Sequence, residues 1–140
     1  MNHKTEVNKV GTTMRKVIIE TIPHNKQRYK TCGDWFENGD NTLRIKVSSL
    51  FNYRYEYLIA IHELIEALLC HERGIAEGDV TKFDEQFEEF RPPLNTDEPG
   101  DHPLAPYKRE HFFATSIERL VASELGVDWI KYEEAINKLS

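Results

Sequence analysis

Cysteine is scarce in this sequence, which has only Cys32 and Cys70 among its 140 residues. The two form no C-x-x-C pair and fall in different expected elements, which favours a reduced, intracellular protein. Long hydrophobic runs are also absent, since no segment approaches the roughly 18 apolar residues that cross a membrane. The first residues are polar and lack the apolar stretch of a signal peptide. We therefore expect a cytoplasmic protein with no membrane partner.

An excess of basic residues is likewise missing. The 18 Lys and Arg residues stand against 24 Asp and Glu, which gives a formal net charge of −6. This balance argues against a nucleic-acid partner, because nucleic-acid-binding surfaces usually have a net basic footprint. The length and the 39% hydrophobic content fit one domain with a modest core. We expect a flexible N-terminus over residues 1–13 and a single domain over residues 14–140.

Strand signals occupy the first third of the chain. Residues 16–22 are rich in β-branched side chains, and residues 43–47 alternate apolar and basic side chains, as a half-buried strand does. Residues 29–36 predict another strand with a break at Gly33. The Asn-Gly-Asp-Asn sequence at 38–41 is a strong turn signal. These patterns predict a small antiparallel sheet of two or three strands.

Helical patterns fill the rest of the chain, and we expect about four helices. The first is long, with Asn52 among its possible N-caps, and ends near Arg73 with Gly74 as the stop. A short helix then follows, capped by Asp79 or Thr81.

A proline-rich loop separates these helices from the last two. Residues 91–106 contain five prolines and form a connection long enough to be functional. The third helix should run from about Tyr107 to Leu125 and end at Gly126, and Asp128 should cap the fourth. Strands first and helices afterwards indicate an α+β domain.

The segment from His62 to Glu66, His-Glu-Leu-Ile-Glu, concentrates residues that carry chemistry. On a helical wheel His62 and Glu66 lie one turn apart in the most apolar face, and Glu63 lies at its edge. A buried carboxylate is costly unless it is paired or binds a metal. A histidine and a glutamate four residues apart can ligate one metal, and Glu63 can then activate a water there. Alternatively, the pair is hydrogen-bonded to a neighbouring helix without metal.

The third helix offers a matching pair. His111 and Glu118 lie within about 20° of each other on its wheel, on a face with small residues that let another helix approach. We predict that His62, Glu66 and His111 bind a metal, with Glu118 as a fourth ligand or as an acceptor that holds a histidine ring. Three protein ligands with one open position is the arrangement of catalytic zinc.

Tyr107 falls near the face of His111 and could donate a hydrogen bond to an oxyanion. Glu63 and Tyr107 are therefore the candidate catalytic residues. The proline-rich loop, flanked by Asp101 and His102, could lie over the site as a lid.

These two helices resemble the zincin group of metallopeptidases, through the His-Glu-x-x-Glu motif and the later helix with His111 and Glu118. In the glutamate-zincin branch, two motif histidines and a downstream glutamate hold zinc, and the motif glutamate is the general base. The resemblance implies that His62 is a ligand, Glu63 the base and Glu118 a third ligand. Glu66 departs from the pattern, since the family has histidine there, which makes manganese or iron possible beside zinc.

A second family also resembles part of the motif. Glu63-x-x-Glu66 is similar to the first acidic motif of all-α nucleotide pyrophosphohydrolases of the MazG kind, which complete a magnesium site with a later Glu-x-x-Asp. The chain offers Asp84 with Glu85 and Glu88 but no clear Glu-x-x-Asp, and the expected sheet fits this family poorly.

The leading hypothesis is a metal-dependent hydrolase that acts on a peptide or small-molecule substrate, with peptide or amide hydrolysis favoured. The alternative from another class is a non-enzymatic binding or inhibitor protein whose His–Glu network is structural. The whole chain also resembles small, uncharacterised proteins of phages and prophages. Because 140 residues leave little room for an extended cleft, a second copy or a protein partner could complete the site.

Overall fold

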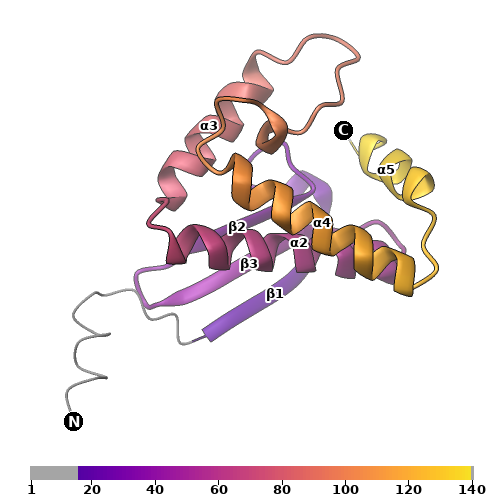
Figure 1. The fold of residues 1–140 in the computed structure, drawn as a ribbon, viewed down its shortest axis with the longest axis horizontal. Coiled ribbons are helices and arrows are strands. Elements are labelled where there is room, and N and C mark those ends of the chain that lie inside the picture. Colours follow the sequence, from indigo (N-terminus) through magenta and orange to yellow (C-terminus); the bar gives the residue numbers. More distant parts are fainter. Residues whose placement is uncertain (1–15, 140) are drawn as a thin grey trace.

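The computed structural model describes residues 16–139, and every structural statement below refers to that part of the chain. Three strands lead and four α-helices follow, which confirms the expected α+β class (Figure 1). The elements are β1 Lys16–Ile22, β2 Gly33–Glu37, β3 Thr42–Ser48, α2 Tyr53–Glu72, α3 Glu77–Glu89, α4 Lys108–Glu124 and α5 Trp129–Asn137, with 3-10 turns η1 His24–Lys26 and η2 Pro99–Asp101. The flexible N-terminus expected at residues 1–13 lies outside the described residues.

The sheet is mixed, so the expectation of a purely antiparallel sheet is wrong. Its order is β1-β3-β2, with β2 antiparallel to β3 but β1 parallel to β3. The chain does reverse after β1, but β3 inserts between β1 and β2 instead of adding at an edge. Side-chain alternation fixes which face of a strand is buried and does not select its neighbour.

The second strand begins at Gly33, four residues later than expected. Tyr29 lies outside the sheet, and its hydroxyl donates a 3.0 Å hydrogen bond to Asp84 on α3. Gly33 lies against α2, where a Cβ would come within 2.7 Å of Ile59 Cγ2 and 2.9 Å of Glu63 Cγ. A glycine at the start of β2 therefore lets the sheet approach the helix that carries the motif.

The core lies between one face of the sheet and α2. Leu43, Ile45 and Val47 alternate along β3 and are buried with Trp35 of β2 and Leu58 of α2. Helix α4 packs along α2, so the two helices meet over a long contact (Figure 1). None of the described helices is both long and apolar enough to cross a membrane.

The ends of three helices agree with the sequence signals. The side chain of Asn52 accepts from two backbone N–H groups of α2, and that of Asp128 accepts from one of α5. Gly74 and Gly126 follow α2 and α4 with φ of 70° and 69°, which favours glycine.

The start of α3 differs from the expectation. The helix begins at Glu77, before the expected caps Asp79 and Thr81, and its N-cap Ala76 makes no side-chain cap. Glu77 and Asp79 instead place negative charge in the first turn, where the helix dipole favours it. The Thr81 hydroxyl bonds to the Glu77 carboxylate 2.8 Å away, inside the helix.

Candidate metal centre

Three of the predicted ligands meet in the contact between α2 and α4. Nε2 of His62 lies 3.1 Å from Oε2 of Glu66 and 3.2 Å from Nδ1 of His111, and the last two atoms are 3.0 Å apart. All three side chains are buried. The helical period of α2 brings His62 and Glu66 to one face, and the packing of α4 adds His111, 45 residues beyond Glu66.

The triangle of donor atoms has the dimensions of a metal site. Ligand atoms bound at 2.0–2.1 Å to tetrahedral zinc lie about 3.3 Å apart, close to the separations of His62, Glu66 and His111. Two imidazole nitrogens and a carboxylate form the donor set of several catalytic zinc sites. The residues present therefore fit a divalent ion with coordination positions left open.

The outer atoms of the ligands are held by hydrogen bonds. Nδ1 of His62 lies 2.8 Å from Oε1 of Glu118, whose other oxygen accepts from the Tyr132 hydroxyl. The indole N–H of Trp35 donates to Oε1 of Glu66 at 3.0 Å. Such contacts fix ring orientation and tautomer, which raises metal affinity. Glu118 therefore contacts the ring of His62, as one of the two roles that the sequence left open for it requires, and its role toward a metal stays a prediction.

Sequence reasoning missed Trp35 and Tyr132, which come from β2 and α5. Both are buried. A buried indole or phenol needs a hydrogen-bond partner for its polar atom. This requirement is the one feature of the sequence that could have indicated a polar contact for Trp35 and Tyr132. The requirement does not say which partner, because neither strand nor helix periodicity relates β2 and α5 to α2.

The proline-rich loop covers the other face of His111. Nε2 of His111 lies 3.2 Å from Oε2 of Glu98 and 3.4 Å from Oδ1 of Asp101. Gly100 is buried against the ring, where a Cβ would come within 2.3 Å of Cγ of His111. Segment 98–101 therefore packs against His111, and a role of the loop as a lid stays a prediction.

Replacing Gly100 with alanine is expected to push the loop away from His111 and weaken zinc binding by roughly tenfold, as loss of outer contacts to a ligand does. Competition with a chromophoric chelator measures this affinity. Gly78→Ala on α3 is the matched control, since nothing lies within 4 Å of its added Cβ. That control should bind zinc normally and gain helix stability. Unchanged zinc affinity in Gly100→Ala would contradict the role of the loop.

The charged groups at the centre shift one another's pKa values. Burial alone lowers the pKa of His62, but the carboxylates of Glu118 and Glu66 outweigh it and raise that pKa well above its ordinary value. Burial also opposes protonation of His111, whose pKa is raised by Asp101, Glu66 and Glu98. Burial raises the pKa of Glu66, yet the two histidines lower it to about 2. Without an ion, protons on the histidines therefore balance the carboxylates.

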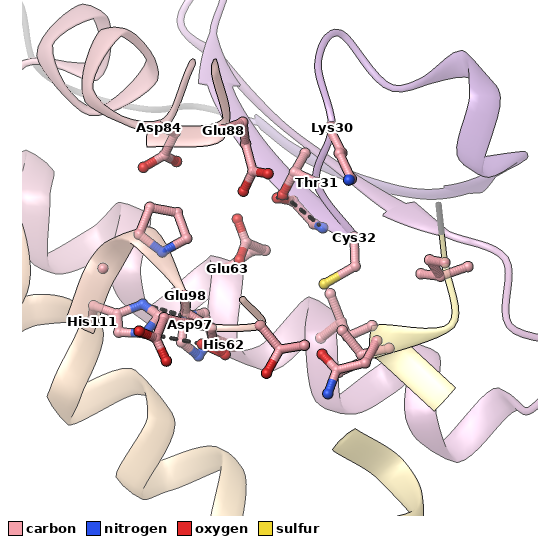
Figure 2. A pocket seen from close by; sticks show the side chains of 18 of the residues that line it. Lys30, Thr31, Cys32, His62, Glu63, Asp84, Glu88, Asp97, Glu98 and His111 are labelled. Atoms are coloured by element: carbon pink, nitrogen blue, oxygen red, sulfur yellow. Dashed lines mark hydrogen bonds and ion pairs between the residues drawn. The ribbon is translucent and has the colours of Figure 1, made fainter. Parts of the chain in front are cut away.

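Glu63 lies on the wall of a cavity of about 220 Å³ that opens onto the centre. Figure 2 shows its carboxyl group inside this cavity, between His62 on one side and Glu88 on the other. Burial, together with the charge of Glu66, raises the pKa of Glu63 well above its ordinary value. A carboxyl group in this setting can hold or accept a proton beside the candidate ligands.

Tyr107 is buried with its ring 6.0 Å from that of His111, in an edge-on arrangement. Its hydroxyl donates to Asp84, which also accepts from Tyr29. Burial raises the pKa of Asp84 to about 7, against the hydrogen bond from Tyr107 that lowers it. An oxyanion would have to compete with Asp84 for the Tyr107 proton, so that role of Tyr107 stays a prediction.

Comparison of the chain with known protein families, with characterised proteins and with solved structures finds no match. The zincin and pyrophosphohydrolase resemblances therefore stay predictions. What the structure brings together is the set His62, Glu66 and His111, supported by Glu118 and with Glu63 nearby.

Proposed function

We propose that this protein is a divalent-metal-dependent hydrolase, with zinc the first choice of ion and a peptide or amide bond the favoured substrate. His62, Glu66 and His111 would hold the ion. The observation that carries this proposal is the convergence of three buried donor atoms within 3.2 Å of one another. Hydrogen bonds to the outer atoms of His62 and Glu66 add support, because contacts of this kind orient the ligands of metal sites.

When bound, zinc on two histidines and a carboxylate supplies a Lewis acid that acidifies water and polarises a carbonyl group. Glu63 accepts the proton of the attacking water and returns it to the leaving amine. Its raised pKa in the metal-free protein falls again beside a cation, toward the range in which a carboxylate is a base. Glu118 keeps the proton of His62 on Nδ1, so that Nε2 presents its lone pair.

The cavity limits the substrate. Its volume of about 220 Å³ lies below the range of about 300–1,000 Å³ typical of drug-sized ligands. It therefore admits one side chain or a small amide and excludes a folded peptide segment.

Replacing Glu63 with glutamine is expected to lower hydrolysis by roughly 10²–10⁴-fold and to leave zinc content unchanged, because the amide cannot accept the proton. A panel of fluorogenic peptide and amide substrates, with zinc measured on protein made without a histidine tag, provides the readouts. Glu72→Gln, exposed near the end of the same helix, is the control with unchanged activity. Full activity in Glu63→Gln would exclude its role as the base.

Metal content also separates this proposal from the non-enzymatic alternative. A binding or inhibitor protein with a structural His–Glu network predicts no stoichiometric metal and no change of stability in chelator. The hydrolase proposal predicts bound metal and a fall in thermal stability when chelator removes it.

A nucleotide pyrophosphohydrolase is the second candidate, because Asp84 and Glu88 line the same cavity as Glu63 and Glu66. The oxygens of Asp84 already accept from two tyrosines, and those of Glu88 accept from Arg91 at 2.7 and 2.9 Å. This occupation disfavours a magnesium site on α3. Magnesium-dependent release of pyrophosphate from a panel of nucleotides is the deciding assay.

A further inference from the structure

The outer nitrogen of His111, Nε2, is a buried polar atom that makes no hydrogen bond among the described residues and faces two carboxylates. Glu98 and Asp101 bring carboxylate oxygens to 3.2 and 3.4 Å from this nitrogen, as ion-pair partners. This differs from His62, whose outer nitrogen has a 2.8 Å hydrogen bond to Glu118. A buried ring nitrogen without a hydrogen bond, facing two carboxylates, is an arrangement that a bound cation would also satisfy.

The three groups have the geometry of ligands. Nε2 of His111 and one oxygen each of Glu98 and Asp101 all lie within 4.8 Å of one another. Figure 2 shows Glu98 beside His111 at the wall of the cavity. The side chains of Glu98 and Asp101 are 55% and 62% exposed, so an ion there could enter from solvent and complete its coordination with water. One imidazole and two carboxylates suit zinc or manganese.

We propose that Glu98, Asp101 and Nε2 of His111 form a second divalent-cation site, the outer site, which shares His111 with the inner site of His62 and Glu66. The outer site stands on its own three ligands. Only the sharing of His111 between two ions rests on the proposed function.

Sharing His111 requires the loss of one proton. A neutral imidazole has one lone pair, so an inner ion on Nδ1 leaves a proton on Nε2. The outer ion takes the place of that proton, which goes to solvent, and the ring becomes a bridging imidazolate. Glu66, Glu98, Asp101 and the imidazolate then carry four negative charges, which match the charge of two divalent ions. The outer ion would also fasten segment 98–101 of the proline-rich loop to α4.

Zinc alone is the probe for the test, with the full chain made without a histidine tag. We expect two zinc ions per wild-type chain, one in the double variant Glu98→Gln/Asp101→Asn, and two in the control Asp97→Asn on the same loop. Isothermal titration in two buffers of different ionisation enthalpy should show about one proton released with the second ion. All three substitutions are at exposed positions, so the variants should fold.

The outcomes distinguish the two sites. One zinc in the wild type that persists in the double variant and is lost in Glu66→Gln overturns the outer site and keeps the inner one. One zinc that is lost in the double variant and persists in Glu66→Gln supports the outer site and overturns the proposed function. A second zinc bound without proton release overturns the shared imidazolate, and no bound zinc overturns both sites.

Discussion

Glu66→Gln is expected to weaken zinc binding at the inner site by about three orders of magnitude, because structural zinc sites gain about 10–16 kcal/mol from four ligands and an anionic one is lost. Glu66 is the only carboxylate of the inner triangle, and its pKa of about 2 shows how strongly the two histidines favour its charge. The amide keeps the shape of the side chain and can still accept from Trp35. Competition titration with a chromophoric chelator measures the change.

Two controls keep this result interpretable. Glu72→Gln removes the same charge from an exposed position of α2 and should bind zinc like the wild type. Glu66→Asp keeps the charge but withdraws the oxygen by one methylene, so its affinity should lie between the two. Equal affinities in wild type and Glu66→Gln, with near-ultraviolet circular dichroism unchanged, would remove Glu66 from the site.

The stability of the metal-free protein is expected to fall as pH rises from about 5 to 9. His62 and His111 have raised pKa values in the folded protein, so their stabilising contribution is complete below about pH 6.5 and is lost at higher pH. Asp84, at about 7, and Glu63 are also raised, so the folded protein keeps protons that the unfolded chain releases above about pH 4. Glu66, at about 2, acts in the opposite sense, as does Asp101, whose pKa is lowered by its contact with His111, and the contribution of both is lost in acid.

In the presence of zinc, the stability of the protein should instead rise with pH. The ion must displace protons from His62 and His111, so its affinity rises with pH. At a free concentration of 100 times the dissociation constant it adds about 2.7 kcal/mol, or roughly 10 °C in melting temperature for a chain of this size. Thermal melts at pH 5, 7 and 9, with zinc and with chelator, measure both trends. A zinc-induced shift that is largest at pH 5 would contradict the assignment of the two histidines as ligands.

The helical part of the site could be predicted from the sequence, because the α-helix has a fixed period. Two wheels placed His62 and Glu66 on one inward face and His111 and Glu118 on another. Caps and glycine stops also fixed three helix ends to within a residue or two. Helix faces, caps and glycine stops are local properties, so the spacing of residues along the chain determines them.

The remaining contacts are set by tertiary packing. No periodicity relates Trp35 on β2, Tyr132 on α5 or Glu98 in the proline-rich loop to the centre, yet each contacts one of its ligands or Glu118. The parallel pairing of β1 with β3 has the same origin, since alternation along a strand does not name the neighbouring strand. Sequence reasoning therefore identified most of the proposed ligands, but it missed the neighbouring residues that keep these ligands in position.

The separation of 45 positions between Glu66 and His111 has a consequence for a chain that is synthesised from its N-terminus. Helix α2, with His62 and Glu66, is synthesised before His111 is added, and α5, with Tyr132, comes last. A nascent chain can therefore offer an ion only two of the three inner ligands. If the proposed inner site binds zinc, its occupancy would report that α4 has been synthesised and docked against α2.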